Sequence, residues 1–209
     1  ATTCEKVLQE IRNLQRSELA EAGEGFDVKK QVGSSTMAHK KNPIKSENAS
    51  GLARIVRSFI IPTYENALLW HERDLANSSS ERFTLSHASA LAEDVMAKTA
   101  DVLTNMWVDK DRCLANIHAQ KGLVMAEKVM IELVDHGVPR DEAHEVLREA
   151  SFTALAKGEE LIDVCSRTPA ISAAFSAEEL EAMFDPMNHV GVAGEIVDEC
   201  VVLARQAIQ

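Results

Sequence analysis

Hydrophobic positions recur at helical spacing along most of the chain. In residues 4–21, apolar side chains fall three or four positions apart with charged residues between them, which predicts an amphipathic helix. The glycines that begin at Gly23 are expected to end it. Asn42 and Pro43 predict the N-cap and the first position of a second, long helix, which is kinked or ended near Pro62.

The later part of the chain predicts another long helix and then shorter ones. The long helix covers residues 87–107 and is followed by Asp109, a typical N-cap residue. Pro139 and Gly158 bracket one of the shorter helices. The shorter helices are expected over residues 121–135, 140–156, 176–183 and 192–207. No strand is predicted, because aromatic residues make up only 4% of the chain and helix-favouring residues dominate.

Length and charge refine this picture. The 209 residues suffice for one large domain or two smaller ones, and 45% hydrophobic with 26% charged residues is ordinary for a globular protein. Residues 1–82 carry 12 basic against 11 acidic residues, a net charge of +1, whereas residues 83–209 carry 10 against 22, a net charge of −12. We therefore predict an anion-handling region followed by an acidic, solvated one, with a domain boundary near residue 110.

Several classes of protein are disfavoured by the same composition. The net charge of −11 argues against nucleic-acid binding, and no apolar stretch approaches the roughly 18 residues of a membrane span. The four cysteines are scattered and His144-Glu145 lacks the second histidine of an HExxH site, so we predict no metal and no cofactor. We expect a cytoplasmic protein, and the start without Met suggests the back part of a longer polypeptide.

Residues 24–42 form a predicted loop with the composition of an anion-binding element. Gly33 precedes the hydroxyls of Ser34 and Ser35, and Lys40 belongs to a cationic pair just before the next helix. Glycine frees the backbone, while hydroxyls, ammonium groups and helix N-terminal amides attract negative charge. A serine acts as a base or nucleophile only where donors, charge or an adjacent base stabilise its alkoxide. A Ser-His-Asp triad stays open at this point, although the chain has no GxSxG elbow.

A second predicted loop, residues 70–82, carries Arg73 and Arg82 with three serines between them. Arginine binds carboxylate and phosphate through two parallel hydrogen bonds, and serines with helix N-terminal amides complete phosphate-binding loops. The alternative for this loop is a surface network of charges with an N-cap for the helix that follows.

Together, the two loops resemble those of one family. The string GSSTMAHKKNPIKSEN, residues 33–48, is similar to the signature loop of the fumarase and aspartase superfamily. With it, WHERDLANSSSER, residues 70–82, is similar to the adenylosuccinate lyases in particular. The resemblance extends through the whole chain and corresponds to roughly the second half of such an enzyme. It implies an all-α fold, with residues 1–110 in a central bundle of long helices and residues 111–209 in a small helical C-terminal domain.

The resemblance also implies a reaction. This is a C–N β-elimination of purine biosynthesis, which releases fumarate from adenylosuccinate and from succinyl-aminoimidazole carboxamide ribotide. It makes Ser34 the general base that takes a proton from the carbon next to a carboxylate. By the same resemblance, Ser35, Lys40 and Asn42 hold the succinyl carboxylates, Asn48 is another substrate-binding residue, and Arg73, Ser78 and Arg82 bind the nucleotide end with its phosphate.

Two departures from the family pattern bear on this site. Ala38 stands where the family usually has proline, so the backbone there is freer. The family's general-acid histidine lies in the first half of the enzyme, and none of the seven histidines here matches it, so neither His39 nor His71 is assigned that role. In the family each site combines segments from different subunits of a homotetramer. We therefore expect the chain alone to be inactive.

Three rival interpretations stay open. The carboxymuconate cycloisomerases share a serine-loop signature but are not expected to need residues 70–82, and argininosuccinate lyase is a weaker rival on the same ground. A non-catalytic member of the superfamily, like the lens crystallins that reuse the fold, is the third. Intact residues at the matched positions argue against a decayed site: Ser34, Lys40, Asn42, Arg73 and Arg82.

Overall fold

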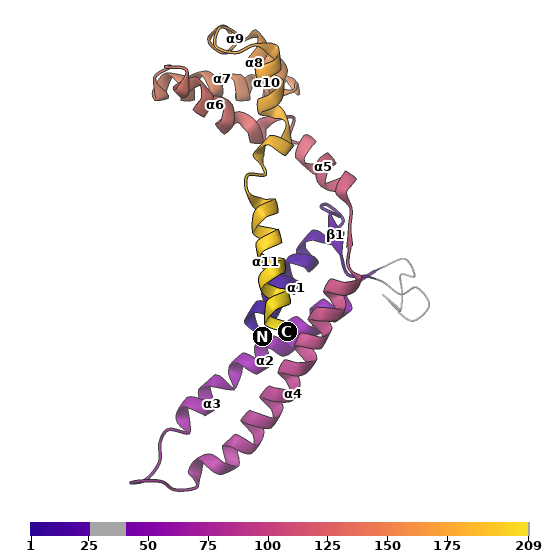
Figure 1. The fold of residues 1–209 in the computed structure, drawn as a ribbon, viewed down its shortest axis with the longest axis vertical. Coiled ribbons are helices and arrows are strands. Elements are labelled where there is room, and N and C mark those ends of the chain that lie inside the picture. Colours follow the sequence, from indigo (N-terminus) through magenta and orange to yellow (C-terminus); the bar gives the residue numbers. More distant parts are fainter. Residues whose placement is uncertain (26–40, 209) are drawn as a thin grey trace. The chain divides into compact units, whose positions relative to one another are not determined.

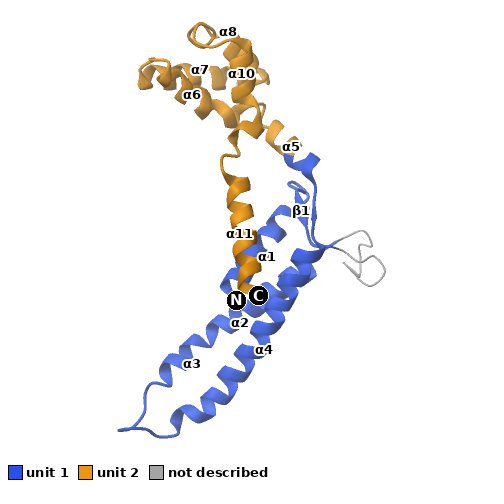
Figure 2. Ribbon diagram, in the orientation of Figure 1, with its two compact units in different colours: residues 1–113 blue, residues 114–209 orange. Residues whose placement is uncertain are grey.

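The computed structural model describes residues 1–25 and 41–208 and divides into two compact units, residues 1–113 and 114–209 (Figure 2). The described residues are mostly helical (Figure 1), so the predicted all-α class is confirmed. The prediction of no strand is wrong in one detail. Ala22–Gly23 (β1) pairs antiparallel with Trp107–Val108 (β2). The domain assignment, with its boundary near residue 110, stays a prediction.

Unit 1 is built from helices that pack along one another. α1 spans Thr2–Leu14, α2 spans Ile44–Ser58 and α4 spans Ala76–Asn105. The short α3, Ile60–Glu65, continues α2 along α4 (Figure 1). α2 contacts both α1 and α4 and is therefore the central helix of the unit. α5, Lys110–His118, begins within unit 1 and ends in unit 2.

Small side chains form the contact face of α2. Ser46, Ala49, Ser50 and Ala53 are buried and recur three or four residues apart, so they share one face of the helix. Because the separation of packed helices depends on the side chains between them, small residues bring α2 close to its neighbours. The hydrophobic core of the unit is correspondingly small and consists of Leu8, Ile11, Ala49 and Val102, with Val7 and Met106 packed against it.

The structure shortens the first predicted helix of unit 1 and confirms the predicted break of the second near Pro62. The first helix ends at Leu14 and not near residue 21, because the chain turns back: Ala20 has a positive φ of 53° and the N–H of Glu21 donates to the carbonyl of Leu14 at 3.1 Å. α2 ends at Ser58, ahead of Pro62. Proline has no N–H to donate to the carbonyl four residues earlier, which is that of Ser58.

α4 starts eleven positions before the predicted helix over 87–107. Phe83 and Leu85 are exposed in the first turns of α4. These turns therefore lack the one-sided hydrophobic pattern from which the helix was predicted. The predicted N-cap at Asp109 is confirmed, since its Oδ1 accepts from the N–H of Arg112 at 2.9 Å at the start of α5.

Unit 2 contains short helices around a core of its own. Its elements are η1 (Leu123–Met125), α6 (Ala126–Asp135), α7 (Arg140–Lys157), α8 (Leu161–Arg167), α9 (Pro169–Ser172), α10 (Ala177–Phe184), η2 (Pro186–His189) and α11 (Ala193–Ile208). The predicted ends of α7 are confirmed, with Gly158 at φ 66° as its C-cap. α8 and α9 are not predicted by the sequence pattern, because each is too short to show a period. Among the described helices, none combines the length and apolar character that a bilayer span requires.

Candidate functional site

The structure places the predicted site residues in two separate regions of unit 1. Asn42 and Asn48 lie at the start of α2, whereas Arg73, Ser78 and Arg82 lie before and within the first turns of α4. Ser34, Ser35 and Lys40 lie outside the described residues.

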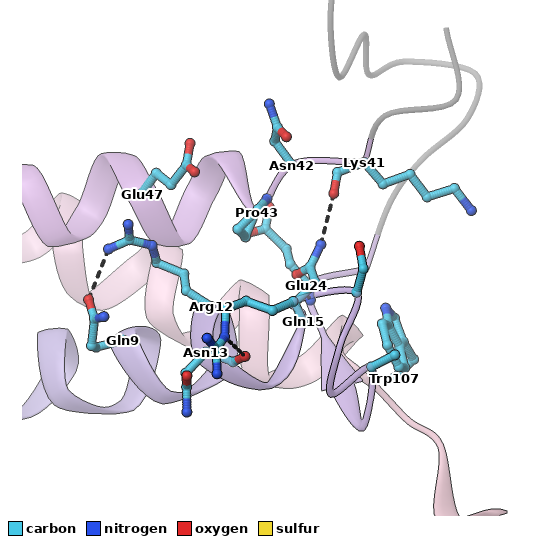
Figure 3. A pocket seen from close by; sticks show the side chains of 13 residues that line it. Gln9, Arg12, Asn13, Gln15, Glu24, Lys41, Asn42, Pro43, Glu47 and Trp107 are labelled. Atoms are coloured by element: carbon cyan, nitrogen blue, oxygen red, sulfur yellow. Dashed lines mark hydrogen bonds between the residues drawn. The ribbon is translucent and has the colours of Figure 1, made fainter. Parts of the chain in front are cut away.

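A cleft opens beside Asn42. Its volume is about 890 Å³, and its walls come from α1, from the segments on either side of residues 26–40, and from β2 (Figure 3). Arg12, Arg16 and Lys41 contribute three basic residues, against the two acidic residues Glu24 and Glu47. Basic residues around a cleft favour ligands that carry carboxylate or phosphate groups.

The N-terminus of α2 is capped by a residue from outside the helix. The predicted N-cap, Asn42, is wrong for this structure: Pro43 occupies the cap position and provides no side-chain acceptor. Glu24, which is 4% exposed, accepts from the N–H of Lys45 at 3.1 Å, and from the N–H and the hydroxyl of Ser46 at 3.0 and 2.9 Å. These amides belong to the first turn, where a helix supplies no partners of its own and favours negative charge. The sequence pattern gives no sign of this contact.

Asn48 has a cationic neighbour that sequence reasoning missed. Its Oδ1 accepts from Nζ of Lys98 at 2.6 Å, and Nζ also pairs with the carboxylate of Asp94 at 2.5 Å. Lys98 is on α4, fifty positions away from Asn48. Contacts over such separations leave no local pattern in a sequence, so only the fold reveals them.

Asp74 organises the second loop. Its Oδ1 accepts from the N–H of Ala76 and its Oδ2 from the N–H of Trp70, both at 2.8 Å. These hydrogen bonds, that to Ala76 first and that to Trp70 second, lower the pKa of the Asp74 carboxyl. The aspartate therefore stays ionised and closes the turn that leads into α4.

Arg73 lies before α4 and Arg82 lies within it. Arg73 and Arg82 are exposed, and within the described part of the chain neither has an ion-pair partner. Of the alternative interpretation, the network of charges is not found among the described residues, whereas Asp74 does bind an amide at the start of α4. Ser78 is half-buried in the first turn of α4, where its N–H donates to the carbonyl of Leu75 at 3.0 Å.

α4 holds the two regions apart. Gly25 lies against the backbone of Asn105, the last residue of α4, so closely that a Cβ at Gly25 would overlap its carbonyl oxygen. Ser78 and Arg82 lie near the other end of the helix. Thirty residues of α-helix extend about 45 Å. From Arg82 to Asn105 the helix rises about 35 Å, so within one copy Arg82 lies far from the cleft that Glu24, Asn42 and Trp107 line.

The described residues offer neither a metal cluster nor a reactive buried thiol. They contain no group of three or more His, Cys, Asp or Glu side chains that could hold an ion. Burial raises the pKa of the Cys165 thiol to about 12, so this cysteine stays protonated within unit 2.

Known sequences resemble this chain over its whole length. Residues 122–200 match the family described as adenylosuccinate lyase C-terminus, and residues 1–58 match the family described as lyase. A curated adenylosuccinate lyase of Archaeoglobus fulgidus is 42% identical over 209 residues, which cover 100% of this chain and 47% of that protein. One of Methanothermobacter thermautotrophicus is 43% identical over 198 residues, which cover 95% of this chain and 44% of that protein. The chain belongs to the adenylosuccinate lyase family.

The chain spans about half the length of the curated adenylosuccinate lyases it matches. Solved structures of the wider superfamily share its fold. The 3-carboxy-cis,cis-muconate lactonizing enzyme from Pseudomonas putida is 28% identical with a TM-score of 0.85, over 99% of this chain and 45% of that chain. A fumarate lyase from Mesorhizobium sp. is 25% identical with a TM-score of 0.81, over 95% of this chain and 43% of that chain. These structures share the helical fold at 25–28% identity, whereas the curated adenylosuccinate lyases are 42–43% identical. The fold is therefore common to the superfamily, and the sequence agrees better with the adenylosuccinate lyases.

Proposed function

We propose that the full-length protein containing this chain is an adenylosuccinate lyase that releases fumarate from adenylosuccinate and from succinyl-aminoimidazole carboxamide ribotide. The observation that carries the proposal is the 42% identity to a curated adenylosuccinate lyase over all 209 residues. The basic cleft beside Asn42 and the exposed arginines of residues 70–82 support it, since the substrate carries carboxylates at one end and a phosphate at the other.

In this proposal the residues act in two groups. Ser34 takes the proton from the carbon next to a substrate carboxylate, and the electrons of that C–H bond are held as an aci-carboxylate until the C–N bond breaks. Ser35, Lys40, Asn42 and Asn48 hold the succinyl part. Arg73, Ser78 and Arg82 hold the nucleotide part. The proton that the leaving nitrogen needs comes from a residue of the full-length protein that lies outside this chain.

We further propose that the working protein is a homotetramer whose sites are shared between copies. The distance between Arg82 and the cleft beside Asn42 supports this, because α4 rises about 35 Å from Arg82 to Asn105, which is more than a single substrate spans. A second copy that presents the opposite end of its own α4 would complete each site.

Turnover by the full-length protein tests the activity. We expect it to convert adenylosuccinate to AMP and fumarate, and we expect Ser34→Ala to lower kcat by at least about a hundredfold because it removes the base. Ser172→Ala is the control, since the hydroxyl of this exposed serine of α9 makes a long hydrogen bond of 3.4 Å to the carbonyl of Pro169. Lactone formation from carboxymuconate without turnover of adenylosuccinate would favour the rival branch instead.

Mixed assemblies test the sharing of sites. Full-length Ser34→Ala and Arg82→Ala proteins are each expected to be nearly inactive. After dissociation and reassembly together, about a quarter of the sites would combine an intact Ser34 from one copy with an intact Arg82 from another. Recovered activity near that level supports shared sites, and no recovery from a properly mixed assembly contradicts them.

A further inference from the structure

Gln15 connects the two flanks of residues 26–40. Its side-chain amide uses both polar atoms: Oε1 accepts from the backbone N–H of Glu24 at 2.8 Å, and Nε2 donates to the backbone carbonyl of Lys41 at 3.0 Å (Figure 3). Glu24 precedes this segment and Lys41 follows it. One side chain, just after the last residue of α1, therefore holds both flanks at a fixed separation.

Glu24 continues the same set of contacts into α2. While its backbone is held by Gln15, its buried carboxylate binds the N–H groups of Lys45 and Ser46 and the hydroxyl of Ser46. Asn42 lies between Lys41, which Gln15 holds, and Lys45, which Glu24 holds. The backbone on both sides of this predicted substrate-binding residue is thus fixed by two side chains, neither of which the family resemblance assigns a role.

We infer that Gln15 and Glu24 are positioning residues for the elimination: they fix the backbone around Asn42, and both flanks of the segment that carries Ser34, without acting on the substrate themselves. The inference rests on the proposed function. A carboxylate that arrives from outside α2 does more than cap a helix. It couples Glu24, which precedes residues 26–40, to Lys45 and Ser46, which follow them. Such coupling matters because a misplacement of about 1 Å in a catalytic group can cost about a hundredfold in rate.

Glu5 provides a matched control within unit 1. Its carboxylate also joins α1 to α2, through Arg54 at 3.3 Å and Arg57 at 2.5 Å, and its side chain is 18% exposed. These contacts involve neither Glu24 nor Lys41. Loss of the Glu5 carboxylate should therefore weaken the packing of α1 on α2 and leave the flanks of residues 26–40 in place.

The test compares three variants of the full-length protein. Gln15→Glu keeps an acceptor for the N–H of Glu24 but sets a second carboxylate oxygen against the carbonyl of Lys41. Glu24→Gln removes one of the two acceptor oxygens at the start of α2. We expect both to lower kcat/KM by about tenfold or more, mainly through kcat, because the reacting groups are misplaced. We expect Glu5→Gln to lower Tm about as much as the other two variants do and to leave kcat unchanged.

The outcomes separate the inference from the function on which it rests. Equal kcat values for all three variants and the wild type would overturn the positioning role while leaving the lyase activity standing. If the wild type itself does not convert adenylosuccinate, the proposed function fails. Amide hydrogen exchange then tests whether Gln15 and Glu24 hold the start of α2 in place. Faster exchange at Lys45 and Ser46 in Gln15→Glu and Glu24→Gln, but not in Glu5→Gln, supports the coupling. Unchanged exchange in all three overturns it.

Discussion

The two units differ in how they bury hydrophobic residues. In unit 2, helices α6 to α10 enclose a core in which Leu133, Leu161 and Ile171 have no exposed surface. In unit 1, α3 and the loop that follows it leave Tyr64 at 74% and Trp70 at 79% exposure. Large exposed apolar surfaces mark places where another molecule binds. Helices α6 to α10 therefore enclose a core of their own, whereas α3 of unit 1 leaves apolar side chains exposed, as does α11 of unit 2, where Val197 and Leu203 are 60% and 64% exposed.

The largest effect is expected from charges placed on the exposed apolar surface of unit 1, which test whether this surface binds another copy. We expect Ile61→Asp combined with Tyr64→Asp to dissociate the proposed tetramer and abolish turnover, because buried charges without partners are costly. Analytical ultracentrifugation measures the mass. Phe152→Asp, at a residue of α7 that is 59% exposed, is the control. A tetramer that survives the double substitution would contradict the role given to this surface.

Truncation within the core of unit 2 tests whether that unit is stabilised from within. Leu161→Ala removes a side chain with no exposed surface and should lower the free energy of unfolding of this unit by about 2–5 kcal/mol. Leu155→Ala, at a side chain that is 60% exposed, should cost much less. Chemical denaturation followed by hydrogen exchange on peptides from α6 to α8 measures both. Similar losses for the two variants would mean that the core is not where the structure puts it.

The stability of unit 1 depends on close contact between backbone segments, and substitutions of two glycines test this. Gly25→Ala places a methyl group against the carbonyl of Asn105, and overpacking of this kind typically costs about 1–3 kcal/mol. Gly51→Ala has open space around it inside α2 and should raise stability by about 0.5–1 kcal/mol. Thermal unfolding of the two variants should therefore move in opposite directions. A gain in Tm for Gly25→Ala would contradict the close contact.

The smallest expected effect concerns Asp74 and pH. Its pKa is lowered in the folded protein, so its contribution to stability is present above the pKa of an unfolded aspartate and is lost as pH falls through the folded value. The Tm difference between the wild type and Asp74→Asn should therefore shrink as the solution is acidified. An NMR titration of the Asp74 carboxyl checks the pKa directly. A difference in Tm that does not change with pH would show that the charge is not what matters.

Local sequence signals predicted those features that depend on neighbouring residues. Pro139 and Gly158 gave the ends of α7, and Asp109 gave the start of α5, because a cap or a positive φ is decided within a few residues. The family and the all-α class followed from two loop motifs and from composition. The cap on α2 could not be predicted, because Glu24 reaches it from across the segment 26–40.

The site was predicted in the same uneven way. Sequence similarity selected Asn42 and Arg82 one at a time, but it carried no information about the length of helix between their regions. Lys98 and Gln15 were missed, since their partners Asn48 and Lys41 are distant in sequence. Their importance follows from tertiary packing, which a local pattern does not encode.

The uninterrupted length of α4 also limits how this protein can evolve. A residue inserted into the middle of the helix would turn one end by about 100° relative to the other and move it by about 1.5 Å. Each copy is proposed to serve two different sites through the two ends of this helix, so one such insertion would misalign all the sites of the assembly at once. We therefore expect insertions and deletions among functional descendants to fall in the loops of unit 2, such as that around Gly137, and to be purged from residues 76–105.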